Sequence, residues 1–328
     1  MKKIKISIIG AGKISCFNEL DSFRKKPATH IGAYLENKNI SVEGIYDINK
    51  NKRNLASKKF NIKNFSSLEK LINITKPDIL VVAVNYKNNL SVISKCLNLS
   101  FVPKIIFCEK PISNNFVSAR KIYDLCKKNK VNLLVNNRRL EEKYSYLKKI
   151  VDKQNVVHVN AKCSSGVHAI GIHMIDLLFF LFGECKVINS VSLNENISKI
   201  KYSNNFERQD PRYLGIFKIK NFYCYFFNTA KTDYSFFEIE ILTKKNKIIM
   251  SQNKNYILIS SIGKINKSTL SYQLKKDEKY YVNSKPLFEN ISKYLVKIIK
   301  QKKLRNNKLS GIHGLKSYEV LDKLKKKL

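Results

Sequence analysis

No stretch of this 328-residue chain contains the roughly 18 consecutive apolar residues that a membrane-spanning helix needs. Basic residues precede an apolar stretch at the N-terminus, but that stretch, Ile6–Ile9, is too short for the core of a secretion signal. A low-complexity composition is absent too, since 44% of the residues are hydrophobic and 11% are aromatic. We therefore expect globular domains, about two at the usual ~150 residues each, with no membrane association.

Paired cysteines are also missing. The seven cysteines are odd in number and widely spaced, and no C-x-x-C pair occurs. This spacing argues against a disulfide framework and against a structural zinc site, so we expect reduced thiols and no metal. Together with the missing secretion signal, it predicts a cytoplasmic protein.

Acidic residues are scarce: 25 face 62 basic ones, for a net charge of +37, and only eight of the basic residues are arginine. A lysine excess with little arginine is typical of AT-rich coding sequence. No helix-turn-helix, zinc-finger or RNP-like pattern accompanies the charge, so we expect no dedicated nucleic-acid partner. The positive field would still favour anionic substrates and cofactors.

The first third of the chain alternates short apolar segments with amphipathic ones, the pattern of β–α–β units around a parallel sheet. The predicted strands are Ile4–Ile9, Val42–Tyr46, Ile79–Val84, Lys104–Cys108 and Asn132–Val135. The predicted helices are His30–Asn37, Leu90–Leu99 and Ser113–Lys128, the last with Ser113 as its N-cap.

The pattern changes after about residue 150. An apolar helix is predicted over Ile170–Phe182, and segments dense in Tyr, Phe and Ile from Lys186 to Leu270 predict a mainly antiparallel sheet. Helices are expected at the end of the chain, over Leu287–Lys300 and Gly311–Lys326. The fold class is therefore α/β, with a parallel, doubly wound domain over 1–125 and an α+β domain with an open, mainly antiparallel sheet over 126–328.

The run GAGKIS at 10–15 follows the first predicted strand directly. In a dinucleotide-binding fold the first glycine makes a tight turn and the second lets a pyrophosphate approach the backbone. The third position of the pattern is Ser15, where glycine is usual, and a plain strand–helix turn is the alternative interpretation. The motif makes Gly10, Gly12, Lys13 and Ile14 candidate cofactor-binding residues.

Asp47 ends the second predicted strand. A carboxylate there can accept hydrogen bonds from the adenosine ribose and would repel a 2′-phosphate, which favours NAD. Its distance from Gly10 is longer than usual because the segment 17–30 is inserted after the glycine motif. Lys50, Lys52 and Arg53 follow and could tolerate the phosphate of NADP, so NADP stays possible.

Glu109-Lys110-Pro111 ends a buried strand. A lysine at the carboxyl end of such a strand points into the crevice where ligands bind. Its ammonium could stabilise alkoxide character on a substrate oxygen during hydride transfer. Pro111 fits a rigid turn, with a cis bond as one option.

Five features occur in order between residues 10 and 176: GAGKIS at 10–15, Asp47, CEKPI at 108–112, Asn-Arg-Arg at 137–139 and GIHMID at 171–176. Together they resemble the glucose–fructose oxidoreductase/inositol dehydrogenase (Gfo/Idh/MocA) family. With the change to a Tyr- and Phe-rich sheet, the resemblance covers essentially the whole chain. The resemblance implies an N-terminal Rossmann domain. It also implies a C-terminal domain whose open sheet serves homodimer or homotetramer assembly.

The resemblance also implies roles for individual residues. Lys110 corresponds to the lysine of the catalytic site, and His173 to a histidine that serves in proton transfer or substrate binding. Asp176, one turn further on the same helix, can contact substrate. Arg138 and Arg139 are candidates for holding substrate, with surface salt bridges as the alternative. Asn85 and Glu109 are expected beside the cofactor.

Two departures from the family pattern bear on catalysis. The family often has an aspartate two residues before the glycine of GIHMID, where this chain has Ala169 with His168 beside it. The threonine-proline turn after the third strand is replaced by the run VNYKNN at 84–89. Contacts on the nicotinamide side therefore differ from the common pattern.

The expected function is that of an NAD(P)-dependent oxidoreductase. It would move a hydride between nicotinamide and a carbinol or keto carbon of a sugar, sugar nucleotide or cyclitol, possible settings being surface-polysaccharide and nucleotide-sugar metabolism. The alternative is a cofactor-binding but non-catalytic partner or regulatory protein of the same fold.

Overall fold

The computed structural model describes residues 2–193, 210–229, 234–275, 277–282, 285–301, 304 and 307–326. The chain divides into two compact units, Met1–Glu141 with Lys285–Lys316, and Glu142–Ser284 with Ser317–Leu328. The expected boundary at 125/126 differs from this division because it falls inside a helix, α5 (Phe116–Lys128), whose following strand pairs in the first sheet.

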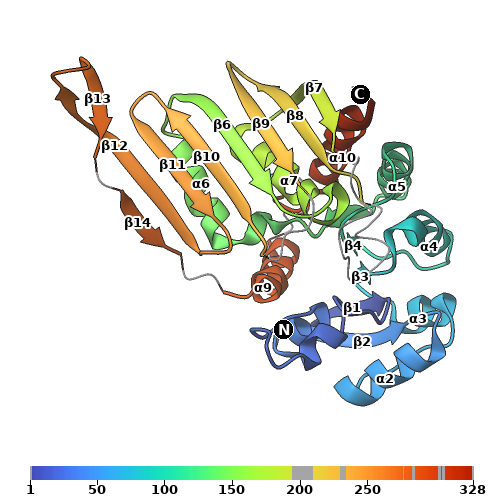
Figure 1. The fold of residues 1–328 in the computed structure, drawn as a ribbon. Helices are drawn as coiled ribbons and strands as arrows, with labels where there is room; N and C mark the ends of the chain where they lie inside the picture. The colour runs from blue at the N-terminus through green and yellow to red at the C-terminus, as the bar shows by residue number, and fades with distance from the viewer. Residues whose placement is uncertain are drawn as a thin grey trace. The chain divides into compact units, whose positions relative to one another are not determined.

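Five parallel strands form the sheet of the first unit, in the order β2-β1-β3-β4-β5 (Figure 1). Their bounds are β1 Ile4–Ile9, β2 Ile40–Tyr46, β3 Ile79–Val82, β4 Ile105–Cys108 and β5 Asn132–Val135. Every residue of β3 and β4 is buried, because central parallel strands are covered on both faces. The predicted doubly wound α/β domain is confirmed.

The helices of this unit, besides α5, are α1 His30–Leu35, α2 Lys50–Phe60, α3 Leu68–Thr75, α4 Asn89–Leu97 and α9 Leu287–Lys300. Short 3₁₀ turns are η1 Phe17–Leu20, η2 Tyr86–Asn88 and η3 Arg138–Leu140. Helix α9 comes from far along the chain, yet its Phe288, Ile291 and Leu295 pack into the core around β1 and β3. This packing explains why residues 285–316 belong to the first unit.

The N-cap of α5 differs from the prediction. The side chain of Asn115, rather than Ser113, accepts a hydrogen bond from the backbone N–H of Ser118, at 2.8 Å. Ser113 is buried and its hydroxyl lies 3.1 Å from the Asn114 side chain. The Ser113 cap was therefore wrong, because an asparagine two residues later caps equally well and begins the helix at Phe116.

The segment Cys16–Pro27 forms an excursion that interrupts the helical path after the glycine motif. The N–H groups of His30 and Ile31 bond the carbonyls of Ile14 and Ser15, at 3.3 and 3.0 Å. Removing the twelve residues Cys16–Pro27 would restore the four-residue spacing of α-helical hydrogen bonds. The predicted insertion thus has a structural counterpart, which starts and ends slightly earlier than the segment 17–30.

The second unit is built on a nine-stranded sheet of order β13-β12-β11-β10-β6-β9-β8-β7, with β14 beside β12 (Figure 1). The described pairs are antiparallel except β6–β9, which confirms the predicted mainly antiparallel sheet. The bounds are β6 Val156–Cys163, β7 Lys186–Ser192, β8 Tyr213–Ile219, β9 Phe222–Asn228, β10 Phe237–Thr243, β11 Asn246–Ser251, β12 Tyr256–Asn266, β13 Ser271–Leu274 and β14 Glu278–Tyr281.

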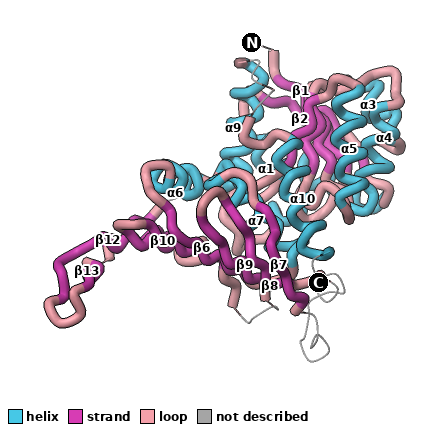
Figure 2. Tube along the Cα trace, turned by 90° about the horizontal axis from the view of Figure 1, so that it is seen from above, coloured by secondary structure: helices cyan, strands magenta, loops and turns pink. Residues whose placement is uncertain are grey.

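Two helices, α6 (Glu142–Val151) and α7 (Ile172–Phe182), lie against one face of this sheet (Figure 2). Residues of β9 alternate strictly between buried and exposed, as a sheet covered on one face requires. The last helix, α10 (Gly311–Lys326), begins in the first unit and ends in the second.

Helix α7 starts later than predicted. A π-helical turn, η4 (Val167–Gly171), precedes it, and the Gly171 N–H bonds the Gly166 carbonyl five residues back at 3.2 Å. Although α7 is strongly apolar, it has only 11 residues. None of the helices in the described part of the chain is both long and apolar enough to cross a bilayer.

Candidate active site

The glycine motif forms a tight turn at the end of β1. Gly10 adopts φ +100°, and a Cβ atom there would lie 2.5 Å from the Ala83 carbonyl oxygen, so only glycine fits. A Cβ on Gly12 would meet only the Ser15 hydroxyl, at 4.0 Å. The backbone is therefore closely packed at the first glycine and open at the second.

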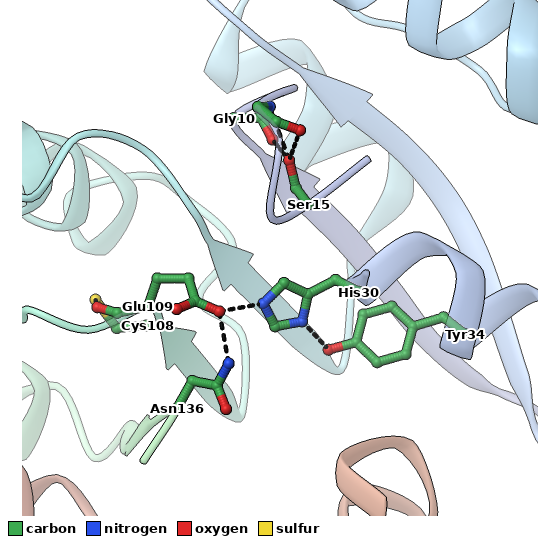
Figure 3. Close-up of polar contacts among 8 residues, drawn as sticks. Gly10, Ser15, His30, Tyr34, Cys108, Glu109 and Asn136 are labelled. Carbon is green, nitrogen blue, oxygen red and sulfur yellow. Dashed lines mark hydrogen bonds and ion pairs between the residues drawn. The ribbon is translucent and has the colours of Figure 1, made fainter. Parts of the chain in front are cut away.

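Ser15 explains why the third glycine of the pattern is dispensable here. Its buried hydroxyl donates to the Gly10 carbonyl at 2.6 Å and accepts from the Gly12 N–H at 2.8 Å. One side chain thus closes the turn on itself (Figure 3).

Two backbone donors of the turn remain open. Among the described residues, the N–H groups of Lys13 and Ile14 have no hydrogen-bond acceptor, and both residues are exposed. Unpaired N–H groups in a glycine turn after a strand form a ready anion site.

Asp47 lies directly after β2 and reaches the same turn. Its Oδ2 accepts from the Ala11 N–H at 2.7 Å, and its Oδ1 accepts from the Asn49 N–H at 2.8 Å. The Arg53 guanidinium donates to the backbone carbonyl of Asp47 at 3.2 Å. The structure thus joins Gly10, Gly12 and Asp47 in one constellation, with the Arg53 guanidinium bonded to the backbone of Asp47.

Glu109, at the end of β4, belongs to a buried polar cluster (Figure 3). Its Oε1 lies 2.6 Å from His30 Nε2 and accepts from Asn136 Nδ2, also at 2.6 Å. The other ring nitrogen of His30 lies 3.0 Å from the Tyr34 hydroxyl. His30, Tyr34 and Asn136 are buried.

The pKa values of this cluster determine which of its atoms carry protons. Burial raises the pKa of Glu109, but the hydrogen bonds from His30 and Asn136, together with the charge of Lys110, outweigh it and hold the pKa below its ordinary value. Burial and the charge of Glu109 raise the pKa of Tyr34 well above its ordinary value. Tyr34 therefore donates to Nδ1 of His30, and Nε2–H donates to an ionised Glu109.

Lys110 follows Glu109, is half-buried, and is joined to Pro111 by a cis peptide bond. The loop after it is held by Asn89, whose buried Nδ2 donates to the Ile112 carbonyl at 2.8 Å. Asn89 is the last residue of the run that replaces the threonine-proline turn. Asn85, the second residue of that run, is exposed and caps η2 by accepting a hydrogen bond from the Lys87 N–H, at 3.0 Å.

The two candidate arginines differ in environment. Arg138 Nε lies 3.5 Å from Glu141 Oε1, so Arg138 makes an ion pair of the kind that the alternative interpretation expects. Arg139 is buried, with 4% of its surface exposed.

In the second unit, His173 and Asp176 lie buried on α7. Asp176 Oδ1 accepts from the Ser317 hydroxyl of α10 at 3.2 Å. His173 and Lys110 thus belong to different units.

The sequence analysis missed His30, Tyr34 and Asn136. The signal was hidden by the excursion: without Cys16–Pro27, His30 would follow Ser15 by three positions, inside the glycine-motif helix. Asp210, described below, gave no signal because no motif surrounds it.

Residues 4–137 match the model of the Gfo/Idh/MocA oxidoreductase family, described as having an NAD-binding Rossmann fold. The matched residues lie within the first unit and include all five strands of its parallel sheet. No curated protein sequence matches the chain.

Several solved structures are similar in fold to nearly the whole length of this chain. UDP-N-acetylglucosamine 3-dehydrogenase from Acidithiobacillus ferrooxidans is 12% identical, with a TM-score of 0.78 over 100% of this chain and 98% of that one. KijD10, a 3-ketoreductase from Actinomadura kijaniata solved with NADP, is 10% identical, with a TM-score of 0.75 over 99% and 98%. The super-repressor mutant of Gal80p from Saccharomyces cerevisiae is 12% identical, with a TM-score of 0.78 over 99% and 95%.

The residues around the glycine turn of the first unit fit a dinucleotide. The space over Gly12 is open, the Lys13 and Ile14 N–H groups lack acceptors among the described residues, and Asp47 stands beside them. Within the described part of the chain, no group of three or more His, Cys, Asp or Glu side chains could hold a metal ion.

Proposed function

We propose that this protein is an NAD(P)-dependent oxidoreductase that moves a hydride between nicotinamide and a carbinol or keto carbon of a sugar, sugar nucleotide or cyclitol. The observation that carries the proposal is the open glycine turn, with two unpaired N–H groups beside a carboxylate. The oxidoreductase family of the domain supports the reaction class. The similarity in fold to UDP-N-acetylglucosamine 3-dehydrogenase and to the 3-ketoreductase KijD10 supports the substrate class.

In this proposal the first unit binds and orients the dinucleotide. Gly10 and Gly12 shape the turn, and the N–H groups of Lys13 and Ile14 hold the pyrophosphate at the positive end of a helical turn. Asp47 accepts from the adenosine ribose. When bound, the nicotinamide ring supplies the hydride acceptor or donor.

The reacting end is assigned to residues after β3, β4 and β5. Asn85 and Glu109 flank the nicotinamide side, with Glu109 held in place by His30 and Asn136. Lys110 polarises the substrate oxygen, because an ammonium stabilises a developing alkoxide. His173 exchanges the hydroxyl proton. Asp176, Arg138 and Arg139 contact the remaining substrate groups.

The choice between NAD and NADP depends on Asp47 and its basic neighbours. Asp47 favours a free ribose, whereas Arg53, which already donates to the Asp47 carbonyl, and the exposed Lys50 and Lys52 favour a 2′-phosphate. We propose NAD as the preferred cofactor, with NADP accepted.

The first test is a fluorescence titration of the protein with NADH and, separately, NADPH. Saturable binding with NADH preferred supports the Asp47 assignment, and a preference for NADPH moves recognition to the basic residues. The matched variants are Gly12→Asp, which places a carboxylate over the open turn, and exposed Lys25→Ala as the control. Binding that Gly12→Asp does not weaken would contradict the proposed turn.

A second candidate function is a cofactor-binding but non-catalytic regulatory protein. Ala169 favours it, because the resemblance implies a carboxylate at that position. The fold shared with a super-repressor mutant, Gal80p, also favours it. Hydride transfer decides between the two: NADH that binds but is not oxidised by any member of a panel of keto sugars and keto-sugar nucleotides supports the regulatory protein.

We propose that the chain assembles as a homodimer or homotetramer through the uncovered face of the second sheet. Large apolar side chains are exposed there on alternating positions of adjacent strands, Leu214 on β8 and Tyr223, Tyr225 and Phe227 on β9. Such a continuous apolar surface is typical of a protein interface. Light scattering after gel filtration tests this, and Tyr225→Lys should shift the mass toward the monomer.

A further inference from the structure

A second polar cluster, in the second unit, joins three segments that are distant in sequence. Asp210, just before β8, accepts from the His168 and Ala169 N–H groups of η4 at 2.9 and 2.8 Å. Its Oδ1 also lies 2.8 Å from His168 Nδ1. The other ring nitrogen, Nε2, lies 3.3 Å from the Lys325 amine on α10.

This geometry selects one form of the histidine. A carboxylate at Nδ1 requires a proton there, so in the neutral ring Nε2 is the acceptor, and the Lys325 amine donates to it. A carboxylate that orients an imidazole, which in turn faces a third proton-bearing group, is the arrangement that activates such a group in acid–base sites. Here the third group is an amine.

Packing holds Lys325 in this position. The neighbouring Leu324 accepts a hydrogen bond from the Ser190 hydroxyl of β7 at 2.7 Å. A Cβ on Gly215 of β8 would lie 2.8 Å from the Leu324 side chain, so the end of α10 sits tightly on these two strands. The Lys325 side chain is half-buried, and among the described residues its amine hydrogen-bonds only His168.

The titratable groups that face the amine come from three elements: His168 on η4, Asp210 before β8, and Asp322 on α10. Burial lowers the pKa of Lys325 below its ordinary value, and the charges of Asp322 and Asp210 oppose this without cancelling it. The amine is therefore neutral more often than that of an exposed lysine.

The same helical segment carries the proposed proton-transfer residue. His168 and His173 are five positions apart across the π turn, and i+5 hydrogen bonding brings such residues closer to one face than an α-helix does. Helix α10 is tied to both ends of this segment, through Lys325 to His168 and through Ser317 to Asp176.

We propose that Lys325 is a second acid–base group of the active site, with His168 and Asp210 as its positioning residues, and that it exchanges protons between His173 and solvent. The inference rests on the proposed function. It also assigns a replacement for the titratable side chain that the resemblance implies at position 169.

The step balances in either direction. In oxidation the substrate O–H bond breaks and its proton passes to His173 and then to the neutral Lys325 amine. The C–H bond breaks, its electron pair leaves with the hydride to nicotinamide, and a C=O bond forms. The Lys325 ammonium then releases the proton to solvent. Reduction runs these transfers backwards.

The first test measures the amine without any turnover. The full-length protein is acetylated with N-hydroxysuccinimidyl acetate over a pH series, and the rate at each lysine is read by mass spectrometry. Lys325 should become reactive at lower pH than Lys323, which is exposed on the same helix turn. His168→Gln and Asp210→Asn should each shift the Lys325 profile. A Lys325 profile that tracks Lys323 and ignores both variants overturns the inference.

The second test measures turnover in the wild type and in Lys325→Ala, with Lys323→Ala as the matched control. Lys325→Ala should lower kcat by roughly 10- to 100-fold, change its pH profile and regain part of the rate with added methylamine. NADH affinity should not change. Unchanged kcat, or a loss that methylamine does not rescue, overturns the inference and leaves a structural tie. A wild type that binds no NADH or turns over no substrate instead defeats the proposed function, and the acetylation result then decides on Lys325 alone.

Discussion

Both units contain a carboxylate–histidine pair, and the two pairs differ in what meets the second ring nitrogen. In the first unit Glu109 and His30 end at the buried phenol of Tyr34. In the second, Asp210 and His168 end at the half-buried amine of Lys325. The pairing of a carboxylate with an imidazole thus builds a closed structural network in the first unit and a network that leads to a titratable amine in the second.

The surroundings explain this difference. Tyr34 has 1% of its surface exposed and a raised pKa, so its proton stays in place over the working pH range. Lys325 has a lowered pKa and partial access to solvent, so its proton can exchange. A carboxylate–histidine pair therefore says little about function until its third member and the exposure of that member are known.

Replacing the lysine beside the first pair, Lys110, should have the largest effect on turnover. Lys110→Ala should lower kcat by about 10²- to 10⁴-fold, because it removes the cation that polarises the substrate oxygen. NADH affinity should stay near the wild-type value, since the open glycine turn is untouched. Steady-state kinetics with a parallel NADH titration measure both, and unchanged turnover would remove Lys110 from the mechanism.

Breaking the first pair should cost stability. Glu109→Ala leaves His30 and Asn136 buried without their shared acceptor, and should lower the free energy of unfolding by about 3–5 kcal/mol. Urea denaturation followed by circular dichroism gives the value. The control is Glu19→Ala, which removes a carboxylate that bonds the Ala28 N–H at the start of α1 rather than the core. A loss no larger than the control's would mean that the cluster is not a stabilising network.

Removing the hydroxyl that meets the second ring nitrogen of His30 should have a smaller effect on stability. Tyr34→Phe removes the donor to His30 Nδ1 and should lower the free energy of unfolding by about 1–3 kcal/mol, the range for an unsatisfied buried polar group. The Glu109–His30 contact would persist, so NADH binding should be unchanged. A variant as stable as the wild type would show that the phenol only fills space.

The smallest expected effect is a difference between the two pairs in how the free energy of unfolding depends on pH. Because the folded pKa of Glu109 is lowered, its contribution is complete above its unfolded pKa and is lost as the pH falls through the folded value. Lys325 has a lowered folded pKa as well, so its burial costs stability at low pH and the cost disappears as the pH rises toward its unfolded value. The free energy of unfolding should depend less on pH in the acid range for Glu109→Gln than for the wild type, and less in the alkaline range for Lys325→Met. The opposite pattern would contradict both assignments.

The sequence predicted the architecture well because the signals were periodic. Buried strands such as Ile79–Val82 are continuous apolar runs, and the change of pattern near residue 150 matches the change from parallel to mainly antiparallel pairing. Helix α2 was missed because only Ala56 is buried on it, which leaves no apolar stripe to detect.

The candidate site was predicted only where local motifs carry it. The glycine turn, Asp47 and Lys110 stand in recognisable runs, whereas His30 and Glu109 are 79 positions apart and meet only in the folded sheet. Asp210 joins His168 from 42 positions away and Lys325 from 157 positions away. Tertiary contacts of this kind leave no spacing rule in a single sequence.

The excursion after the glycine motif, Cys16–Pro27, is an insertion with defined ends. The backbone resumes its helical hydrogen bonds across the gap, and Glu19, inside the excursion, returns its carboxylate to the Ala28 N–H and the Thr29 hydroxyl at 2.9 and 2.7 Å. The outermost side chain, Phe23, is 99% exposed. A fluorophore or epitope could therefore replace the tip of this loop and report on events at the glycine turn, eight positions before Phe23, provided that Glu19 is kept.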